Sequence, residues 1–526
     1  MSAPQTVAIR PRAVPASRLR TSRWILLTAL VAYALTGGGR VVGSDEVTML
    51  ELSRALGRGA IAVPEGATLQ GPDGRHYSKN AAGQAVLALP LVAIGEAASR
   101  LAGLPSRTRA LAVRAVASFF NAAVTAILLA GFYLLARWLG IGVVAAVAAT
   151  LGLGFTTPLW VYAKSFMAEP LQALGLLAAV VGAARARTPQ GATLAAVGIA
   201  LAVSVKLSML PLVLPCLIGF AIQRPVLPLV PWIGLAAALG GHVGYNLVRF
   251  GSLWETGYGA QATVSAYTTP LLVGLYGLLF SSGKGVAWFA PLVWLAPAGW
   301  VAAWRGGRAT ENAESTPARA ARAAASIGLV VWLVALLLYA RFQHWAGDGS
   351  FGPRYLVPAL PIAFLFVAFA LDRASRVRRA IAVGLAVVGL LVQVGGVAIY
   401  FGAQMREAGD YPYTLPLDHP RFMHDSHFNP AFSPIAGHWR MLCRNLSEHL
   451  RGEAPRVAEG GVVDPRIGVS PENQRQLLHG LDFWWLYVGY VGMPRAPAYA
   501  AVLGLLAVLI WALMRLAAAA RAEARA

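Results

Sequence analysis

The sequence has few charged residues for its length. Only 13% of its 526 residues are charged, whereas 57% are hydrophobic, and the mean hydropathy is +0.59. Soluble globular domains carry about 25% charged residues, so this balance excludes an ordinary water-soluble enzyme. Many continuous apolar runs of about 18 residues or more instead predict an all-α polytopic membrane protein. The runs do not alternate between apolar and polar residues, which argues against a β-barrel.

Several features of known cofactor sites are also scarce. The two cysteines, Cys216 and Cys443, lack metal-ligand spacing, and the predicted topology separates them, so we expect no disulfide. The stretch "SSGKG" around Lys284 does not have the spacing of a nucleotide-binding phosphate loop. No clear Asp-x-Asp pair is present, and three tail histidines form no specific ligand pattern. We therefore predict no cofactor, and a divalent metal stays open as an alternative that no clear motif supports. The histidines are His424, His427 and His438.

Apolar runs separated by short arginine-bearing turns fill most of the chain. The first run, "WILLTALVAYALTGG", follows Arg18, Arg20 and Arg23 and has no clear small-residue cleavage site after it, so we expect an uncleaved span. Length and hydropathy predict twelve spans: 24–42, 110–136, 140–161, 168–184, 191–207, 209–223, 227–247, 286–304, 324–341, 354–371, 380–401 and 497–515.

The distribution of arginine predicts the orientation of these spans. If the N-terminus is cytoplasmic, all the short arginine-rich turns and the C-terminus face the cytoplasm. We therefore attribute the formal charge of +21 to membrane topology and predict no nucleic-acid binding. Only four of the 23 acidic residues lie on that side: Glu311, Glu314, Asp372 and Glu523.

This topology divides the chain into three parts. Residues 1–401 form a transmembrane core whose first outer loop, 43–109, carries the chemistry. Residues 402–496 form an outer tail of small-domain size, and 497–526 form the last span with a cytoplasmic end. Because residues 83–104 contain Pro90, Glu96 and Arg100, we expect an amphipathic helix at the outer membrane face there rather than a span.

Polar residues gather in the predicted outer loops. In "SDE", Asp45 beside Glu46 is suited to act as a general base toward a hydroxyl group; the alternative is a solvated helix cap. Lys79, next to Tyr77, is suited to hold a phosphate; the alternative is a lysine that extends to the membrane interface. Two later loops supply further candidates: Arg249, Glu255 and Lys284 in one, and His344, Asp348 and Arg354 in the other.

The chain resembles the GT-C superfamily of glycosyltransferases, and within it the bacterial family 39, which is similar to dolichyl-phosphate-mannose-protein mannosyltransferases. The resemblance covers most of the chain through short motifs. These are "SDE" after the first span, "YSKNAAGQAVLALP", "MAEP", "NLVRFGSLWETGYG", "LLFSSGKGVAWFAP", "FGPRYLVPALP" and "FSPIAGHW".

The resemblance implies roles for individual residues. Asp45 is expected to be the base of an inverting transfer, with Glu46 orienting the acceptor or a metal. Lys79 matches the phosphate-contacting lysine of a family Lys-Pro-Pro stretch, although alanines follow here in place of prolines. Glu169 is expected to line the same cavity, and Arg354 to make a second phosphate contact. Arg114 points into that cavity or forms a structural ion pair.

Together these observations predict a membrane glycosyltransferase. It moves a hexose or pentose from an outer-leaflet polyprenyl-phosphate sugar to a hydroxyl of a glycan, lipid or protein. The resemblance places it in a bacterial plasma membrane with an extracytoplasmic active site. Two alternatives stay open: a transporter or flippase for a lipid-linked sugar, and a glycan ligase or polymerase that uses a diphosphate donor.

Overall fold

The described part of the chain is mostly helical. The computed structural model describes residues 15–64, 68–223, 225–306, 316–347, 349–410, 426–453, 480–490 and 493–526. These residues include two short strands, β1 (Leu69–Gln70) and β2 (His76–Tyr77), which pair antiparallel in the first long loop. The predicted all-α class is therefore confirmed.

Each of the twelve predicted spans falls on one or more helices, because continuous apolar runs satisfy their backbone groups within a helix. These helices are α1 (Ala16–Thr36), α4 (Ser106–Ala117), α5 (Phe120–Trp138), α6 (Val143–Phe155), α7 (Leu159–Ala163), α8 (Glu169–Ala184), α9 (Pro189–Val205), α10 (Leu210–Ile222), α11 (Val230–Phe250), α13 (Val286–Phe289), α14 (Ala296–Gly306), α15 (Thr316–Arg341), α16 (Leu360–Leu371), α17 (Arg376–Ala398) and α23 (Arg495–Arg525).

Shorter elements lie between and beyond these helices. The helices are α2 (Ser44–Leu56), α3 (Gly83–Leu101), α12 (Leu271–Phe280), α18 (Phe401–Asp410), α20 (Pro434–Arg451) and α22 (Trp484–Tyr490). The 3-10 turns are η1 (Leu207–Met209), η2 (Gly259–Ala262), η3 (Val264–Ala266), η4 (Pro291–Leu295), η5 (Arg354–Ala359) and η6 (Pro430–Phe432).

The length and hydropathy of a helix indicate whether it can cross a membrane. Among the described residues, six helices are long and apolar enough to cross a membrane by length and composition. The number of twelve crossings therefore stays a prediction. The six helices are Gly83–Leu101, Thr108–Trp138, Pro317–Arg341, Arg354–Leu371, Arg376–Ala398 and Arg495–Arg525.

Helix α3 has two different faces. Ala85, Ala88 and Val92 are buried, whereas Val86 and Ile94 are exposed. This amphipathic pattern agrees with the interfacial helix predicted for residues 83–104. The same helix also has the length and apolarity of a membrane span, so its interfacial position stays a prediction.

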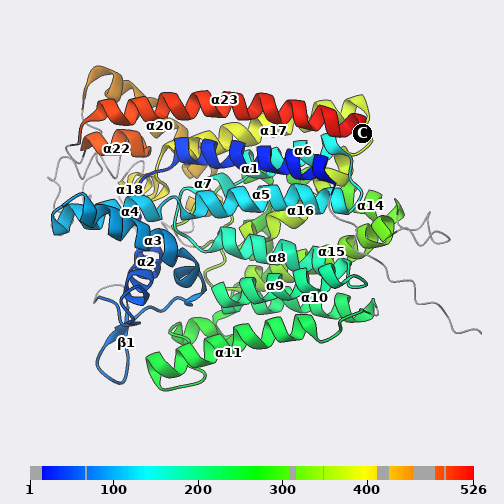
Figure 1. The fold of residues 1–526 in the computed structure, drawn as a ribbon, viewed down its shortest axis with the longest axis horizontal. Helices are drawn as coiled ribbons and strands as arrows, with labels where there is room; N and C mark the ends of the chain where they lie inside the picture. The colour runs from blue at the N-terminus through cyan, green and yellow to red at the C-terminus, as the bar shows by residue number, and fades with distance from the viewer. Residues whose placement is uncertain are drawn as a thin grey trace, which may run out of the picture.

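The long helices run side by side in one bundle, with α11 at one edge and α23 at the opposite edge (Figure 1). Between these edges α23 packs on α1, α1 on α5, α5 on α8, α8 on α9 and α9 on α11. The first loop with β1 lies at one end of the bundle together with α20 and α22, and the C-terminus lies at the other end (Figure 1). The first loop and the described parts of the tail therefore lie at the end of the bundle away from the C-terminus.

Glycines set the close approach of α8 and α9. A Cβ atom added to Gly175 would lie 2.7 Å from the amide nitrogen of Ala202 and 2.8 Å from the carbonyl oxygen of Gly198. No side chain fits at that separation, so the two backbones touch directly. Such small-residue contacts are typical of helix packing within membranes.

A buried carboxylate fastens α23 to α1 and α5. Glu523 accepts hydrogen bonds from the hydroxyls of Thr21 and Tyr133, each at 2.7 Å, and from Nε of Arg137 at 3.0 Å. Its side chain is only 3% exposed. Because a buried charge is costly without partners, this group stabilises the docked position of the last helix.

We predict that Glu523→Gln lowers the free energy of unfolding by about 1–3 kcal/mol, because it removes the charge that faces Arg137. Thermal unfolding in detergent measures this change. Glu453→Gln serves as the matched control, since Glu453 pairs with Arg451 at 2.9 Å but is 53% exposed. An exposed pair contributes less than about 1 kcal/mol. Equal effects of the two variants would contradict the fastening role of Glu523.

Candidate functional site

The start of α2 places the acidic pair of the first loop. Oε2 of Glu46 accepts a hydrogen bond from the backbone amide of Gly43 at 2.8 Å, and Oε1 accepts one from the amide of Phe166. Glu46 is 3% exposed, and this burial raises its pKa, although the two amide bonds act in the opposite direction. Both oxygens of Glu46 are thus engaged by the backbone. Glu46 therefore fixes the first turn of α2 and, with it, the position of Asp45.

Asp45 meets two cations that come from distant parts of the chain. Nζ of Lys79 lies 3.1 Å from Oδ1 of Asp45, and Nη2 of Arg354 lies 3.4 Å from Oδ2. Nε of Arg354 also donates to Oε1 of Glu169 at 2.6 Å. We call these four residues the Asp45 cluster. All four were predicted from the sequence as site residues, and the fold brings them together from the first loop, the start of α8 and η5.

The cluster keeps Asp45 ionised. Burial opposes ionisation, but the positive charges of Arg354 and Lys79 outweigh it and hold the pKa of this carboxyl below its usual value. The Asp45 side chain is still 24% exposed, and that of Lys79 is 39% exposed. This partial exposure leaves an ionised carboxylate and a cation accessible to a small ligand.

Lys206 joins the same group of charges, although the sequence analysis did not select it. Charge interactions couple Lys206 to Arg354, Glu169, Asp45 and Lys79, and its Nζ lies 5.4 Å from the ring centre of Tyr355. The signal was available, because Lys206 interrupts the apolar stretch "AVSVKLSML". An ionisable residue between two apolar runs is a site hypothesis by default.

The loop after α11 lies against the Asp45 cluster. Oη of Tyr258 donates to Oδ1 of Asn80 at 2.8 Å, and Nδ2 of Asn80 donates to the carbonyl of Asp45 at 3.3 Å. Burial raises the pKa of Tyr258, so its hydroxyl stays protonated. The side chain of Asn80 thereby links this loop to the backbone of Asp45.

Arg249 supports the loop that carries Lys79. Its Nη1 donates to the carbonyl of Ser78, and its Nη2 donates to Oδ1 of Asn246 at 2.7 Å. Its guanidinium also lies 3.9 Å from the ring centre of Tyr245. Arg249 was predicted to contact a phosphate directly; in the structure its donors engage the carbonyls of Ser78 and Tyr245 and the side-chain oxygen of Asn246 instead.

The structure does not bring the remaining predicted residues into the Asp45 cluster. Lys284 is buried and donates to the carbonyl of Ser350, and the charge of Arg114 acts on Tyr487. Tyr77 donates to Asp73 at 2.5 Å, His344 lies near Gln261, and exposed Glu255 accepts from the amide of Gly257. Asp348 lies outside the described residues.

A second group of buried charges, which the sequence analysis missed, lies on the other side of Glu46. Asp482 is 2.7 Å from Nη2 of Arg40 and 2.8 Å from Nζ of Lys164, and all three side chains are less than 10% exposed. Lys164 also donates at 2.6 Å to the carbonyls of Val397 and Asp482. This Asp482 cluster holds the C-terminal part of the predicted tail against the segment that follows α1, the end of α7 and the end of α17.

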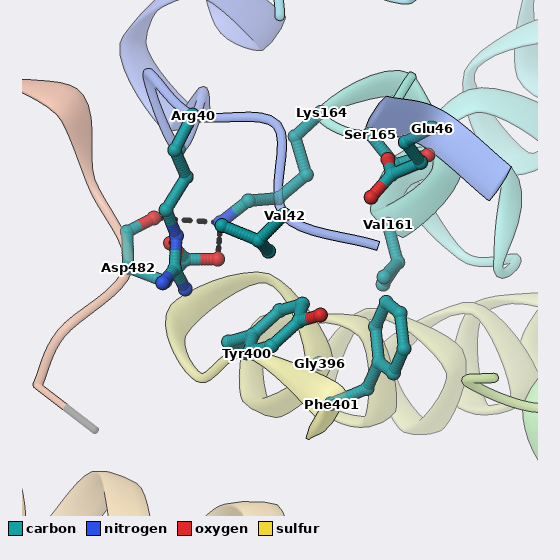
Figure 2. Close-up of a pocket in the computed structure, with 11 residues that line it drawn as sticks. Arg40, Val42, Glu46, Val161, Lys164, Ser165, Gly396, Tyr400, Phe401 and Asp482 are labelled. Atoms are coloured by element: carbon teal, nitrogen blue, oxygen red, sulfur yellow. Dashed lines mark hydrogen bonds and ion pairs between the residues drawn. The ribbon is translucent and has the colours of Figure 1, made fainter. Parts of the chain in front are cut away.

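A small, partly open pocket lies between the Asp482 cluster and Glu46. Figure 2 shows Arg40 and Lys164 converging on Asp482 at one side, with Glu46 and Ser165 at the other. Burial opposes ionisation of Asp482, but the charges of Arg40 and Lys164 hold its pKa below the usual value. The charged groups on both sides of the pocket thus have protein partners: Arg40 and Lys164 pair with Asp482, and Glu46 accepts from two backbone amides.

Metal binding finds no support in the described part of the chain. There, no group of three or more His, Cys, Asp or Glu side chains is placed to hold a metal ion. His424 lies outside the described residues. His438 donates from Nδ1 to the carbonyl of Pro434 at 2.6 Å and packs against the ring of Phe351.

No protein-family model matches the chain, and no curated protein matches it. Two solved structures of ArnT from Cupriavidus metallidurans are similar to it in fold. The one bound to undecaprenyl phosphate has a TM-score of 0.45 and 16% identity, over 93% of this chain and 76% of that chain. The apo structure has a TM-score of 0.41 and 14% identity, over 94% and 74%. Similarity at this level does not assign a function.

We predict that Glu46→Ala destabilises the protein by about 1–3 kcal/mol, because it leaves the buried amide of Phe166 without its acceptor. Thermal unfolding in detergent tests this expectation. The matched control is Glu255→Ala, which also removes a carboxylate that accepts from a backbone amide, at 2.7 Å, but in an exposed loop. An unchanged melting temperature for Glu46→Ala would show that α2 does not depend on this contact.

Proposed function

We propose that this protein is an integral membrane glycosyltransferase of the GT-C kind, similar to family 39. It would transfer a sugar from a polyprenyl-phosphate donor to a hydroxyl group. The observation that carries the proposal is the Asp45 cluster, in which a partly exposed carboxylate lies 3.1 Å from Lys79 and 3.4 Å from Arg354. The cluster lies at one end of an apolar helical bundle, where a lipid-linked substrate can reach it.

The proposed reaction is a single displacement at the anomeric carbon of the sugar. The acceptor oxygen forms a bond to that carbon while the bond from the carbon to the phosphate oxygen breaks. The bonding electron pair leaves with the phosphate, and Asp45 takes the proton of the acceptor hydroxyl. One displacement inverts the anomeric configuration. No metal is needed to balance these steps.

The cations serve the leaving group in this mechanism. Lys79 and Arg354 both pair with Asp45 in the structure. A bound phosphate competes for both cations and stabilises the charge that develops as the sugar leaves. When Lys79 and Arg354 bind the phosphate in place of Asp45, the pKa of Asp45 rises, and it becomes a stronger base for the acceptor hydroxyl. Glu169 keeps Arg354 in place through their 2.6 Å hydrogen bond.

The side of the membrane is part of the proposal. The arginine-rich turns place both termini in the cytoplasm and the Asp45 cluster outside, in a bacterial plasma membrane. The ArnT structure bound to undecaprenyl phosphate contains a lipid phosphate of the proposed class. That similarity is too distant to carry the proposal, which rests on the residues of the cluster.

We predict that the purified, reconstituted protein removes the sugar from one member of a panel of polyprenyl-phosphate sugars, whereas Asp45→Asn does so at least about 100-fold more slowly. Mass spectrometry of the lipid fraction measures both. Glu51→Gln is the control, since Glu51 lies in the same helix and pairs with Arg54 at 3.0 Å.

Two other outcomes would overturn this function. Loss of sugar only from diphosphate-linked donors would identify a glycan ligase or polymerase. Tight lipid binding without any loss of sugar, equal in wild type and Asp45→Asn, would favour a transporter or flippase. Either result contradicts a phosphate-sugar transferase that uses Asp45 as its base.

The pH dependence follows from the charges around Asp45. The base acts in its ionised form, and its pKa lies below the usual value of about 3.9 for aspartate, so kcat/KM should stay constant as pH falls from 7 to about 5. The rate should fall only at more acidic pH. Lys79→Gln removes one of the two lowering charges and should move this acidic limb to higher pH. An acidic limb near pH 6 in the wild type would contradict Asp45 as the base.

A further inference from the structure

The chain leaves helical geometry between α7 and α8. Residues 164–168, which we call the linker turn, belong to neither helix, although Phe166 in their middle is fully buried. Figure 2 shows Ser165 of this turn on the same side of the pocket as Glu46. In a continuous helix the amide of residue 170 would donate to the carbonyl of Phe166, but Pro170 has no N–H group. The buried carbonyls of the linker turn therefore need other donors.

Two buried amide side chains supply these donors. Nε2 of Gln84, in α3, donates to the carbonyl of Phe166 at 2.5 Å. Nδ2 of Asn121, in α5, donates to the carbonyl of Ser165 at 2.8 Å and to that of Met167 at 2.6 Å. Gln84 is 1% exposed and Asn121 is 0% exposed. Three successive carbonyls of the linker turn are thus held by side chains from two other helices.

Each of these two amides also buries an unmatched oxygen. Oε1 of Gln84 and Oδ1 of Asn121 receive no hydrogen bond from the residues that the structure describes. A buried acceptor without a donor destabilises a fold. An apolar side chain of similar size would pack there without that unmatched oxygen, so packing alone does not explain the two amides. Their hydrogen bonds to the linker turn do.

The linker turn connects the two carboxylates that orient the Asp45 cluster. The amide of Phe166 donates to Oε1 of Glu46, which fixes the turn of α2 that carries Asp45. Directly after the linker turn, Glu169 begins α8 and accepts from Nε of Arg354 at 2.6 Å. Asp45 and Arg354 meet each other at 3.4 Å. The position of the linker turn therefore acts on both members of this contact.

We propose that Gln84 and Asn121 are positioning residues of the Asp45 cluster. They hold the linker turn, and through it they set the separation between the carboxylate of Asp45 and the guanidinium of Arg354. Neither side chain has to touch a substrate for this role. The inference rests on the proposed function for its effect on turnover, whereas the position of Asp45 can be measured without any donor.

The chain offers a matched control for Gln84. Gln393, in α17, is 0% exposed, and its Nε2 donates to the carbonyl of Phe289 at 2.8 Å. Its Oε1 likewise has no partner among the described residues. Gln84→Met and Gln393→Met each remove one buried hydrogen bond from an amide to a carbonyl and keep the length of the side chain. The melting temperatures of the two variants should therefore fall alike, but only Gln84→Met releases the linker turn.

The test measures how fast a water-soluble carbodiimide labels Asp45 at pH 5 in the full-length protein in detergent, by mass spectrometry of its peptides. The Asp45 side chain is 24% exposed and can be reached by the reagent. A carbodiimide reacts with the protonated carboxyl, and the charges of Arg354 and Lys79 hold the pKa of Asp45 below its usual value. Displacement of Arg354 raises that pKa, and each unit increases the protonated fraction about tenfold.

We expect Asp45 to be labelled about 3- to 10-fold faster in Gln84→Met and in Asn121→Leu than in the wild type, and at the wild-type rate in Gln393→Met. Lys79→Gln is the positive reference, because it removes one of the two charges directly. Labelling at the wild-type rate in folded Gln84→Met or Asn121→Leu would overturn the proposal. Equal acceleration in Gln393→Met would overturn it too, since the fold would then be loosened as a whole.

Turnover separates this inference from the proposed function. If the wild type transfers sugar, Gln84→Met should lower kcat/KM about tenfold and move its acidic limb to higher pH, whereas Gln393→Met should do neither. Faster labelling in Gln84→Met without any transfer by the wild type would leave the positioning role intact and overturn the transferase. Transfer by the wild type with unchanged labelling in Gln84→Met would overturn the positioning role and leave the transferase intact.

Discussion

Charge pairing inside an apolar bundle is the constraint on which this structure depends. An ionised side chain among apolar helices is tolerated only where partners compensate its lost hydration. Glu523 meets this condition with Thr21, Tyr133 and Arg137, and Asp482 meets it with Arg40 and Lys164. These groups join segments that are hundreds of residues apart in the chain. They fasten the last helix at one end of the bundle and the segment around Asp482, within the predicted tail, at the other.

The Asp45 cluster follows the same rule only in part. Its carboxylate is paired but partly exposed, and one buried oxygen of Glu169 has no hydrogen-bond partner among the described residues. The carboxylates that support the fold therefore have charged partners, whereas one carboxylate oxygen at the proposed substrate site has no hydrogen-bond partner among the described residues. Incomplete pairing costs stability, and a ligand that completes it recovers that cost as binding free energy. Such local conflict between stability and ligand binding is typical of functional sites.

The supporting residues explain how loops hold a defined geometry. Glu46 uses both oxygens to secure the first turn of α2, and Arg249 secures the carbonyl next to Lys79. Asn80 and Tyr258 tie a third loop to the backbone of Asp45. None of these contacts requires the side chain to touch a substrate. They hold the charged groups of the cluster at fixed distances, which electrostatic stabilisation of a reacting phosphate demands.

The sequence by itself determined the helical class, the positions of the helices and four members of the cluster. Apolar length and arginine-bearing turns are local signals, and Asp45, Lys79 and Arg354 are polar residues of the predicted outer loops. Glu169 was selected through the family resemblance. Only the tertiary structure decided which polar residues meet. Arg249 and Glu46 looked equally suited to a substrate, yet packing commits both to other protein groups. Lys206, which directly follows α9, lies instead with its Nζ 5.4 Å from the ring centre of Tyr355 in η5. Partners of this kind are set by contacts between distant segments, which no local pattern encodes.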